Sequence, residues 1–270
     1  MAAHVWRPRP WTPSVYTRNP GPTTGELRIV ARESGRTTSG IPIFSDNEGT
    51  MRLTGSPPST AVHECSHITP GGLYLTDLLS RAECKKIVDT TERFDSWSED
   101  APVSLGRDVR RNSTCVWIAS DELNDAIFER ARRCLPPTVG GSGPIAGLNA
   151  RWRLYRYHGD EGDVFRPHTD GSWPGSGIVD GQLLHDRFCD GRWSRLTFLM
   201  YLNDDFEGGE TSFFTPVGGR WARSGAVGAI EGSALVFPHG EASPLHEGSL
   251  VTRGTKYVAR TDVLYHAPSL

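Results

Sequence analysis

The sequence predicts an α+β fold that is mainly β, in which two helices precede a sandwich or jelly roll of short strands. Glycine and proline contribute 30 and 19 of the 270 residues, a turn-rich composition that favours β structure over a helical bundle. Hydrophobic side chains make up 37% of the chain, which is enough for a sizeable core in one large domain. Apolar residues have helical spacing before residue 135 and alternate with polar residues after residue 150.

The charge and the cysteine pattern narrow the classes of function. A formal net charge of −3 provides no basic field for nucleic acid, and no apolar run is long enough for a transmembrane helix. The five cysteines are scattered and odd in number, which favours reduced thiols over a disulfide framework. Because the N-terminal residues lack the apolar stretch of a secretory signal, we expect a cytoplasmic protein, or a nuclear or organellar one if residues 1–60 carry a targeting segment.

Composition divides the chain into three regions. Residues 1–60 are rich in proline, threonine and serine, and their first 40 residues contain six arginines but only two acidic residues. We expect an N-terminal arm that is extended or partly disordered, with an organelle transit segment as the alternative. The dipeptide Pro57-Pro58 is the expected boundary. Residues 61–147 are predicted to form a helical support region, and residues 148–270 the β core.

Two helices are predicted within the support region. A strand or turn at residues 72–79 leads into the first helix, residues 81–93, because Ser80 and Glu83 form the S-x-x-E pattern of a capping box. The second helix is expected at residues 121–134. Two acidic residues begin it, two arginines end it and a proline follows, in agreement with the helix dipole.

Short segments of alternating polarity predict the strands of the β core. Glycine-containing turns separate them, and they are expected at residues 151–158, 164–169, 194–202, 210–214, 226–230, 233–238, 245–250 and 256–265. The segment between the strands at 164–169 and 194–202, residues 171–193, is too long for a simple hairpin loop. We therefore expect a mobile lid that becomes ordered on substrate binding, with Trp173 in contact with the substrate. The alternative is a static loop in which Trp173 and Trp193 are packed core residues.

The strongest chemical signal is a set of three metal-ligand types in the β core. His168 and Asp170 are two residues apart, so on an extended segment their side chains point to the same side. His246 lies on a later predicted strand and completes the set if that strand faces the first. Two imidazoles and one carboxylate form the facial triad of non-haem Fe(II) oxygenases, which leaves three positions open for a co-substrate and O₂. A zinc hydrolase uses similar ligand types, although no helical H-E-x-x-H pattern contains these ligands: the one run of this pattern, HECSH (63–67), lies far from them and is expected on a strand.

The residues around these ligands form a series of motifs between residues 150 and 266, with Lys256 at the start of the last strand. The motifs are YRY (155–157), FRPHTDG (165–171), RLTFLMYLN (195–203), EGGETSF (207–213), GSALVFPH (232–239) and LHEG (245–248). In their order and spacing they resemble the prolyl 4-hydroxylase type of the Fe(II)/2-oxoglutarate-dependent dioxygenases.

The resemblance implies a double-stranded β-helix core, which is a jelly roll, buttressed by the N-terminal helices. It implies that His168, Asp170 and His246 hold Fe(II). The co-substrates would be 2-oxoglutarate and O₂, with ascorbate as a further candidate cofactor. Lys256 would bind the distal carboxylate of 2-oxoglutarate as a point charge.

Further contacts to the co-substrate are implied by the same resemblance. Tyr157 and Tyr201 lie where related enzymes place tyrosines that hydrogen-bond 2-oxoglutarate. Thr197 lies on the same strand as Tyr201 at an even spacing, so both side chains should line the inner face. Arg260 and Asp262 face inward from the last strand. Arg260 is predicted to contact 2-oxoglutarate or the substrate backbone, or alternatively to form an ion pair with Asp262.

The predicted activity is hydroxylation of a prolyl residue in a peptide or protein, in which 2-oxoglutarate loses CO₂ to give succinate. The alternative is the same iron chemistry on a free amino acid or another small molecule, with substrate selection expected in loops 95–110 and 171–193. A catalytically silent jelly-roll module that binds a metal or a peptide is the third hypothesis, but such a module has no need of the triad together with Lys256. Halogenation is disfavoured because Asp170 occupies the position of a halide. Neither a membrane nor nucleic acid is an expected partner.

Several other histidines and one cysteine are expected to be structural residues rather than metal ligands. His63, Cys65 and His67 share one face of a short segment, but no fourth ligand is near, and a polar strand at a domain edge is the favoured interpretation. Three further histidines are expected to lie on the surface or to pack in the core: His158, His185 and His239.

Overall fold

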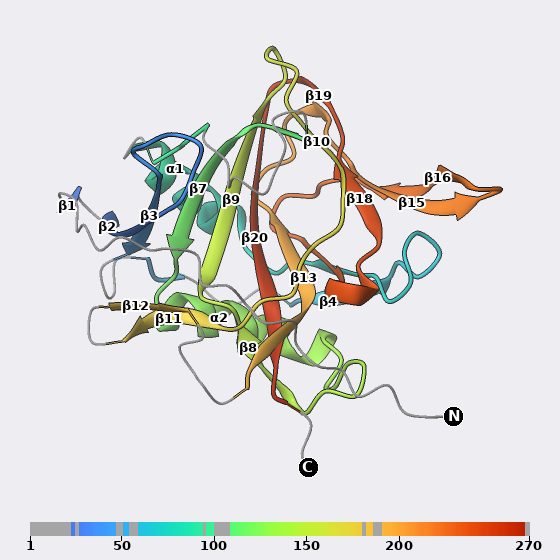
Figure 1. Cartoon of the computed structure of the whole chain (residues 1–270), viewed down its shortest axis with the longest axis horizontal. Coiled ribbons are helices and arrows are strands. Elements are labelled where there is room, and N and C mark those ends of the chain that lie inside the picture. The colour runs from blue at the N-terminus through green and yellow to red at the C-terminus, as the bar shows by residue number, and fades with distance from the viewer. Residues whose placement is uncertain are drawn as a thin grey trace.

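The structure is a computed structural model that describes residues 23–24, 27–46, 51–53, 59–93, 96–99, 109–179, 182–185 and 191–267. Two β sheets dominate these residues, and two helices accompany them (Figure 1). The predicted α+β class with a mainly β, jelly-roll core is therefore confirmed. None of the helices in the described ranges is both long and apolar enough to cross a membrane.

The larger sheet has eleven strands and spans most of the chain. In spatial order it contains β1 (Thr23–Thr24), β2 (Leu27–Glu33), β3 (Ile41–Asp46), β7 (Ser113–Ile118), β9 (Arg151–His158), β20 (Thr255–Tyr265), β13 (Trp193–Tyr201), β17 (Ala234–Pro238), β5 (Leu73–Thr76) and β4 (Ala61–Glu64), and β8 (Ile145–Leu148) also pairs with β20. Adjacent strands are antiparallel except β3 and β7, which run parallel. The long central strand β20 thus lies between β9 and β13 and brings the end of the chain into the middle of the fold (Figure 1).

The smaller sheet has five strands and carries the metal-ligand motifs. Its order is β16 (Arg220–Val227), β15 (Thr211–Val217), β18 (Leu245–Gly248), β10 (Val164–His168) and β6 (Arg110–Arg111). Two separate pairs complete the strands, β11 (Ser176–Val179) with β12 (Gln182–His185) and β14 (Glu207–Gly208) with β19 (Val251–Arg253). The β15–β16 hairpin extends well beyond the rest of the molecule (Figure 1).

Both predicted helices are present. Helix α1 (Arg81–Arg93) begins with the expected capping box, in which the Ser80 amide donates to the Glu83 carboxylate at 2.8 Å and the Glu83 amide donates to Ser80 Oγ at 3.3 Å. Helix α2 (Asp121–Ala131) is shorter than predicted, because its last turn continues as a 3₁₀ helix, η1 (Arg132–Cys134). Its N-cap is Ser120, whose side chain accepts from the amide of Leu123. A second 3₁₀ turn, η2 (Gly240–Ala242), follows β17.

Hydrophobic residues are buried on both faces of the larger sheet. One cluster joins helix residues such as Ile87 and Ile127 to Trp117 and Trp152 on the sheet. A second cluster fills the space between the two sheets and includes Tyr155, Tyr157, Phe165, Tyr201, Phe213 and Phe237. The alternation of side chains along the central strands therefore directs one set toward the helices and the other toward the smaller sheet.

Residues 27–46, inside the predicted N-terminal arm, belong to the larger sheet. Strands β2 and β3 form a hairpin, and β3 pairs with β7. Leu27, Ile41 and Ile43 are completely or almost completely buried. We did not predict strands here, because the surrounding composition is that of a tail. Residues 1–22 and the predicted boundary Pro57-Pro58 lie outside the described residues, and the division of the chain into domains remains a prediction.

Strands β7 and β16 are two of the core strands that differ from the sequence prediction. Strand β7 was not predicted, because all six of its residues are buried and a strand covered on both faces shows no alternation. A strand predicted at residues 226–230 instead runs from Arg220 to Val227 as the partner of β15 across the turn at Gly218-Gly219. Most of β16 is exposed, so no buried face marked its beginning in the sequence.

The predicted lid segment contains ordered structure. Its described residues include the β11–β12 hairpin, whose Ile178 and Leu183 pack against a small apolar cluster of β2, β3 and β7. At the end of the segment nearer to Asp170, the Trp173 side chain is 45% exposed. The static alternative, with both tryptophans buried, is therefore wrong for Trp173. The mobility of the segment and its contact with a substrate remain predictions.

Candidate active site

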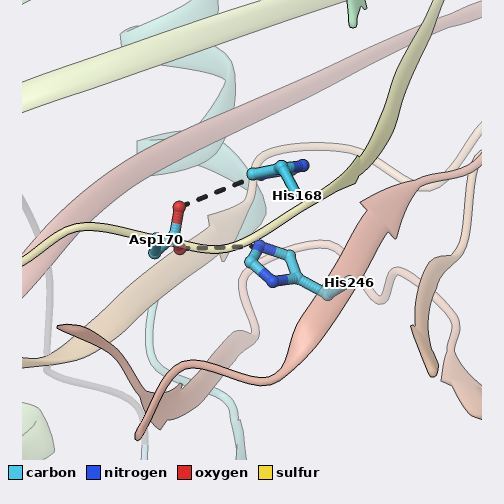
Figure 2. A group of neighbouring side chains, drawn as sticks. All are labelled: His168, Asp170 and His246. Carbon is cyan, nitrogen blue, oxygen red and sulfur yellow. Dashed lines mark ion pairs between the residues drawn. The ribbon is translucent and has the colours of Figure 1, made fainter. Parts of the chain in front are cut away.

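The predicted metal ligands meet at one end of the smaller sheet. His168 ends β10 and lies directly opposite His246 of β18 in the strand register, and Asp170 follows β10 by two residues. His168 Nε2 lies 3.8 Å from Asp170 Oδ1, and His246 Nε2 lies 3.5 Å from Asp170 Oδ2 (Figure 2). One ligand atom from each residue lies within 4.8 Å of the other two. Among the described residues this is the one cluster of its kind.

Backbone carbonyl groups orient both imidazole rings. His168 Nδ1 lies 2.8 Å from the Arg166 carbonyl oxygen, and His246 Nδ1 lies 3.0 Å from that of Pro244. A carbonyl oxygen only accepts, so each Nδ1 carries the proton and each Nε2 lone pair is free to bind a metal. Phe165 stacks on His168 with ring centroids 3.6 Å apart and an interplanar angle of 8°. The ring is therefore fixed in position by packing as well as by hydrogen bonding.

The protonation states of these groups suit metal binding. Burial, together with the neighbouring His246, lowers the pKa of His168 to about 4, so its ring is neutral at pH 7. Burial alone raises the pKa of Asp170, but the positive charge of Arg260, together with the hydrogen bond from Thr197, outweighs it and holds the pKa below its ordinary value. Two imidazoles and one carboxylate, with their ligand atoms turned toward one another, fit a divalent iron ion.

A cavity extends from the metal ligands toward Lys256. Its wall includes residues from both sheets: Tyr155, Tyr157, Phe165, His168, Asp170, Thr197, Leu199, Thr211, Phe237, His246, Gly248, Lys256, Val258 and Arg260. All predicted metal and co-substrate residues except Tyr201 line this wall, and Tyr201 is completely buried beside it. The structure thus brings together residues that lie up to about a hundred positions apart in the sequence.

Lys256 is buried between two tyrosine rings at the far end of this cavity. Its Nζ lies 5.2 Å from the ring centroid of Tyr157 and 5.8 Å from that of Tyr201. The ammonium group donates to the carbonyl oxygen of Gly209 at 2.5 Å, and burial lowers its pKa to about 8. A buried cation of this kind favours an anionic group of a ligand. Thr211, which the sequence did not single out, bonds to the Tyr201 hydroxyl at 2.8 Å.

Arg260 interacts with two carboxylates, one of which belongs to the metal ligand Asp170. Its guanidinium lies 3.1 Å from Asp262 and 3.5 Å from Asp170 Oδ1. The ion pair with Asp262, one of the alternatives derived from the sequence, is present, and the contact with Asp170 was not expected. A further contact of Arg260 with 2-oxoglutarate or with the substrate remains a prediction.

Thr197 makes a second contact with the metal carboxylate, and His239 contacts Thr197. Thr197 lines the inner face as predicted, but its hydroxyl donates to Asp170 Oδ2 at 2.7 Å. His239 is 5% exposed and lies 3.2 Å from the Thr197 hydroxyl. This contact could not be predicted from the sequence, because Pro238 ends β17 and the alternation of side chains does not continue past the end of a strand.

The other histidines whose side chains the structure describes lie outside this ligand cluster. His63 lies on the exposed strand β4 at the edge of the larger sheet, and His67 is exposed in the following turn. The interpretation of this segment as a polar edge strand is confirmed for residues 61–64. His158 bonds to Thr255 at 3.2 Å. The side chain of His185 lies outside the described part of the chain.

A comparison with protein families identifies the family that this arrangement matches. Residues 152–261 match the model of the 2OG-Fe(II) oxygenase superfamily, and this stretch contains all three metal ligands together with Lys256. The chain carries a 2OG-Fe(II) oxygenase domain. Membership in this superfamily implies Fe(II) and 2-oxoglutarate, which fit the donor set and the buried cation described above. No curated protein matches the chain in sequence.

Solved structures resemble this 2OG-Fe(II) oxygenase in fold. A Trichoplax adhaerens prolyl hydroxylase in complex with a hypoxia inducible factor peptide fragment has a TM-score of 0.50 and 19% sequence identity, and the match covers 75% of this chain and 86% of that one. The viral collagen prolyl hydroxylase of Paramecium bursaria Chlorella virus-1 has a TM-score of 0.48 and 18% identity, with 72% and 95% covered. A Pseudomonas putida prolyl-4-hydroxylase has a TM-score of 0.46 and 15% identity, with 76% and 96% covered. The Trichoplax structure shows the shared fold.

Proposed function

We propose that this 2OG-Fe(II) oxygenase hydroxylates a prolyl residue in a peptide or protein substrate. The observation that carries the proposal is the single cavity that joins the His168, Asp170 and His246 cluster to the buried ammonium group of Lys256. The prolyl part is supported by the motifs in their order along the chain and by the Trichoplax prolyl hydroxylase, which was solved with a peptide. Trp173, half-exposed three residues after Asp170, offers an apolar surface for a prolyl ring at the edge of the site.

Five residues of the cavity have distinct parts in the proposed mechanism. When bound, iron supplies the activation of O₂, so that one oxygen atom enters the substrate C–H bond and the other converts 2-oxoglutarate to succinate and CO₂. His168 and His246 present their Nε2 atoms, and Asp170 presents an ionised carboxylate. Lys256 would neutralise the distal carboxylate of 2-oxoglutarate. Tyr157 would contribute to a wall that excludes water from this charge pair.

A second candidate is the same reaction on a free amino acid or another small carboxylate. Arg260 favours it, because its guanidinium lies beside the metal ligands and its buried Nε has no hydrogen-bond partner among the residues that the structure describes. A group of this kind could bind the carboxylate of a small substrate. Ascorbate is proposed as an auxiliary cofactor for either substrate.

A substrate panel tests the proposal. The whole chain is supplied with Fe(II), 2-oxoglutarate, ascorbate and air, and succinate release is compared across proline-rich peptides, matched peptides with alanine in place of proline, and free amino acids. The proposal expects proline-dependent succinate release and a product heavier by one oxygen atom. Release that depends on a free amino acid would favour the second candidate, and release with neither class would overturn the prolyl assignment.

The affinity for 2-oxoglutarate should depend on the charge of Lys256. Because burial lowers the pKa of Lys256 to about 8, the ammonium group is charged below that pH and is lost above it. The KM for 2-oxoglutarate should be level below pH 8 and rise toward about tenfold per pH unit above it. Pyruvate, which has the 2-oxo acid group but no distal carboxylate, serves as the control ligand, and its inhibition constant should not show this rise. Parallel pH profiles for the two ligands would contradict the role of Lys256.

Replacing Trp173 with alanine should uncouple the reaction. Because the side chain is 45% exposed, its loss should cost less than about 1 kcal/mol of stability. We expect 2-oxoglutarate still to be consumed while less hydroxylated product forms, which the ratio of succinate to product measures. Trp221→Ala is the matched control, since Trp221 is 60% exposed on the distant β15–β16 hairpin. A loss of about 3 kcal/mol or more with unchanged coupling would identify Trp173 as a structural residue instead.

A further inference from the structure

A buried chain of hydrogen bonds leads from the predicted lid segment to the metal carboxylate. The amide of Trp173 donates to Ser194 Oγ at 2.7 Å, and Ser194 Oγ lies 2.9 Å from His239 Nε2. On the other side of the ring, His239 Nδ1 lies 3.2 Å from Thr197 Oγ1, which donates to Asp170 Oδ2 at 2.7 Å. The four side chains are between 0% and 6% exposed. No part of the proposed reaction uses Ser194 or His239.

The direction of each bond follows from the two ends of the chain. The ionised carboxylate of Asp170 only accepts, so the single hydroxyl proton of Thr197 is given to it. Thr197 Oγ1 must then accept from His239, which places a proton on Nδ1. A neutral ring with its proton on Nδ1 accepts at Nε2, and the Ser194 hydroxyl is the donor there. Burial lowers the pKa of His239, which agrees with a neutral ring.

Asp262 and Arg260 support the same arrangement from the other side. Asp262 Oδ1 lies 3.6 Å from His239 Nδ1 and 3.1 Å from the guanidinium of Arg260. A second nitrogen of Arg260 lies 3.5 Å from Asp170 Oδ1. The carboxylate of Asp170 is therefore contacted at one oxygen by Arg260 and at the other by Thr197, so its rotation about the Cβ–Cγ bond is restricted.

We propose that His239 is a positioning residue for the metal site: with its proton on Nδ1, it fixes the Thr197 hydroxyl on Asp170 and connects the metal carboxylate to the backbone of Trp173. The proposal rests on the metal site of the proposed function. Without the Nδ1 proton the Thr197 hydroxyl loses a donor and gains rotational freedom, and Asp170 must be ordered by the metal itself. Hydrogen-bond partners that orient a metal ligand typically affect affinity by about 10- to 100-fold.

The affinity of the whole chain for Mn(II), measured by calorimetry, tests this role without turnover. Thr197→Val keeps the shape of the side chain and removes the hydroxyl, and should weaken Mn(II) binding about 10-fold or more. Thr197→Ser, which keeps the hydroxyl, should stay within about threefold of the unmodified chain. His239→Phe should weaken binding to a similar extent as Thr197→Val, because both variants release the same carboxylate oxygen.

Two isosteric variants of His239 separate the two ring nitrogens. The amide nitrogen of asparagine occupies the place of Nδ1, so His239→Asn should restore most of the affinity lost in His239→Phe. The amide group of glutamine reaches the place of Nε2 and offers nothing to Thr197, so His239→Gln should not restore it. If asparagine and glutamine behave alike, or if His239→Phe binds Mn(II) like the unmodified chain, the proposal is overturned.

A double variant distinguishes positioning from general loss of packing. Thr197→Val combined with His239→Phe should bind Mn(II) no more weakly than Thr197→Val alone, because His239 acts through the Thr197 hydroxyl. Losses that multiply would show that His239 acts by another route, and would overturn the proposal. If one His239 variant does not fold, the difference in Mn(II) affinity between Thr197→Val and Thr197→Ser still tests the role of the Thr197 hydroxyl.

The tautomer of His239 provides a measurement that needs no metal. ¹⁵N NMR of histidine-labelled chain, with the His239 signal identified from its absence in His239→Asn, should show the proton on Nδ1. A proton on Nε2 would overturn the proposal. A chain that has the Nδ1 proton but binds neither Mn(II) nor Fe(II) would instead contradict the proposed function, so the two failures are distinguishable.

Discussion

Replacing His168 or Asp170 with alanine is expected to abolish metal binding and turnover while leaving the fold intact. Each residue supplies one of three ligand atoms that lie within 4.8 Å of one another. Since even an orienting hydrogen-bond partner is typically worth about 10- to 100-fold in metal affinity, loss of a ligand itself should cost more than about 100-fold. Arg260 keeps Asp262 as its partner in Asp170→Ala, so no buried charge is left unpaired by that variant.

The measurements are Mn(II) affinity, succinate release and thermal unfolding of each variant. His158→Ala is the matched control, because His158 is half-buried and bonds to Thr255 on the same domain but lies outside the ligand cluster. This control should bind Mn(II) and release succinate like the unmodified chain. An alanine variant of His168 or Asp170 that unfolds, or that still binds Mn(II) tightly, would assign these residues to the core rather than to a metal site.

Replacing Lys256 should raise the KM for 2-oxoglutarate by about 100-fold while Mn(II) affinity changes by less than about threefold. The physical reason is that a charge-assisted contact in a buried site contributes about 2–3 kcal/mol. The Lys256 side chain is among the largest fully buried side chains of the described residues. Lys256→Met is the better variant for this test, since methionine fills much of the same space and Lys256→Ala would also leave a void between Tyr157 and Tyr201.

The control for this variant is Lys85→Met, because Lys85 is exposed on α1, where it pairs with Asp89. It should leave the KM for 2-oxoglutarate unchanged. A KM that stays the same in the Lys256 variants would transfer the anchoring role to Arg260, which faces the same cavity. Loss of Mn(II) binding together with 2-oxoglutarate binding would indicate that Lys256 supports the structure of the site instead.

The candidate site could be predicted from the sequence where its residues lie on regular strands. His168 and Asp170 are two positions apart on an extended segment, and Lys256, Val258 and Arg260 alternate along β20, so their common orientation follows from strand geometry alone. The motifs around them supplied the pairing between distant strands, which spacing cannot give. All of these side chains line one cavity.

The rest of the site depends on turns and on long-range packing. His239 follows Pro238, which ends β17, so its direction is set by the turn into η2 and cannot be derived from the alternation along the strand. Its partners Ser194 and Thr197 come from β13, more than forty residues away in sequence. Polar contacts of this kind leave no periodic pattern, because a buried hydrogen bond needs only two suitable atoms at the right distance.

The fold shows the same distinction. Helix α1 was predicted with its bounds because its signal is local, a capping box followed by apolar residues at helical spacing. Strand β7 has no local signal, because both of its faces are buried. Cys115 and Trp117 belong to the apolar cluster that contains the helices, and Val116 and Ile118 belong to a second cluster with residues of β2 and β3. A strand buried on both faces can be identified only when its neighbours are known.

The central claim is that one cavity holds Fe(II) and 2-oxoglutarate together, and anaerobic calorimetry of the whole chain tests it most directly. Fe(II) should bind once per chain, and 2-oxoglutarate should then bind once per chain with an affinity that depends on both the metal and Lys256. The dependence on the metal follows from the position of Lys256 in the same cavity as the three ligands. The claim is contradicted if 2-oxoglutarate does not bind. It is also contradicted if the metal-free chain and the Lys256→Met variant bind 2-oxoglutarate as tightly as the unmodified chain with Fe(II).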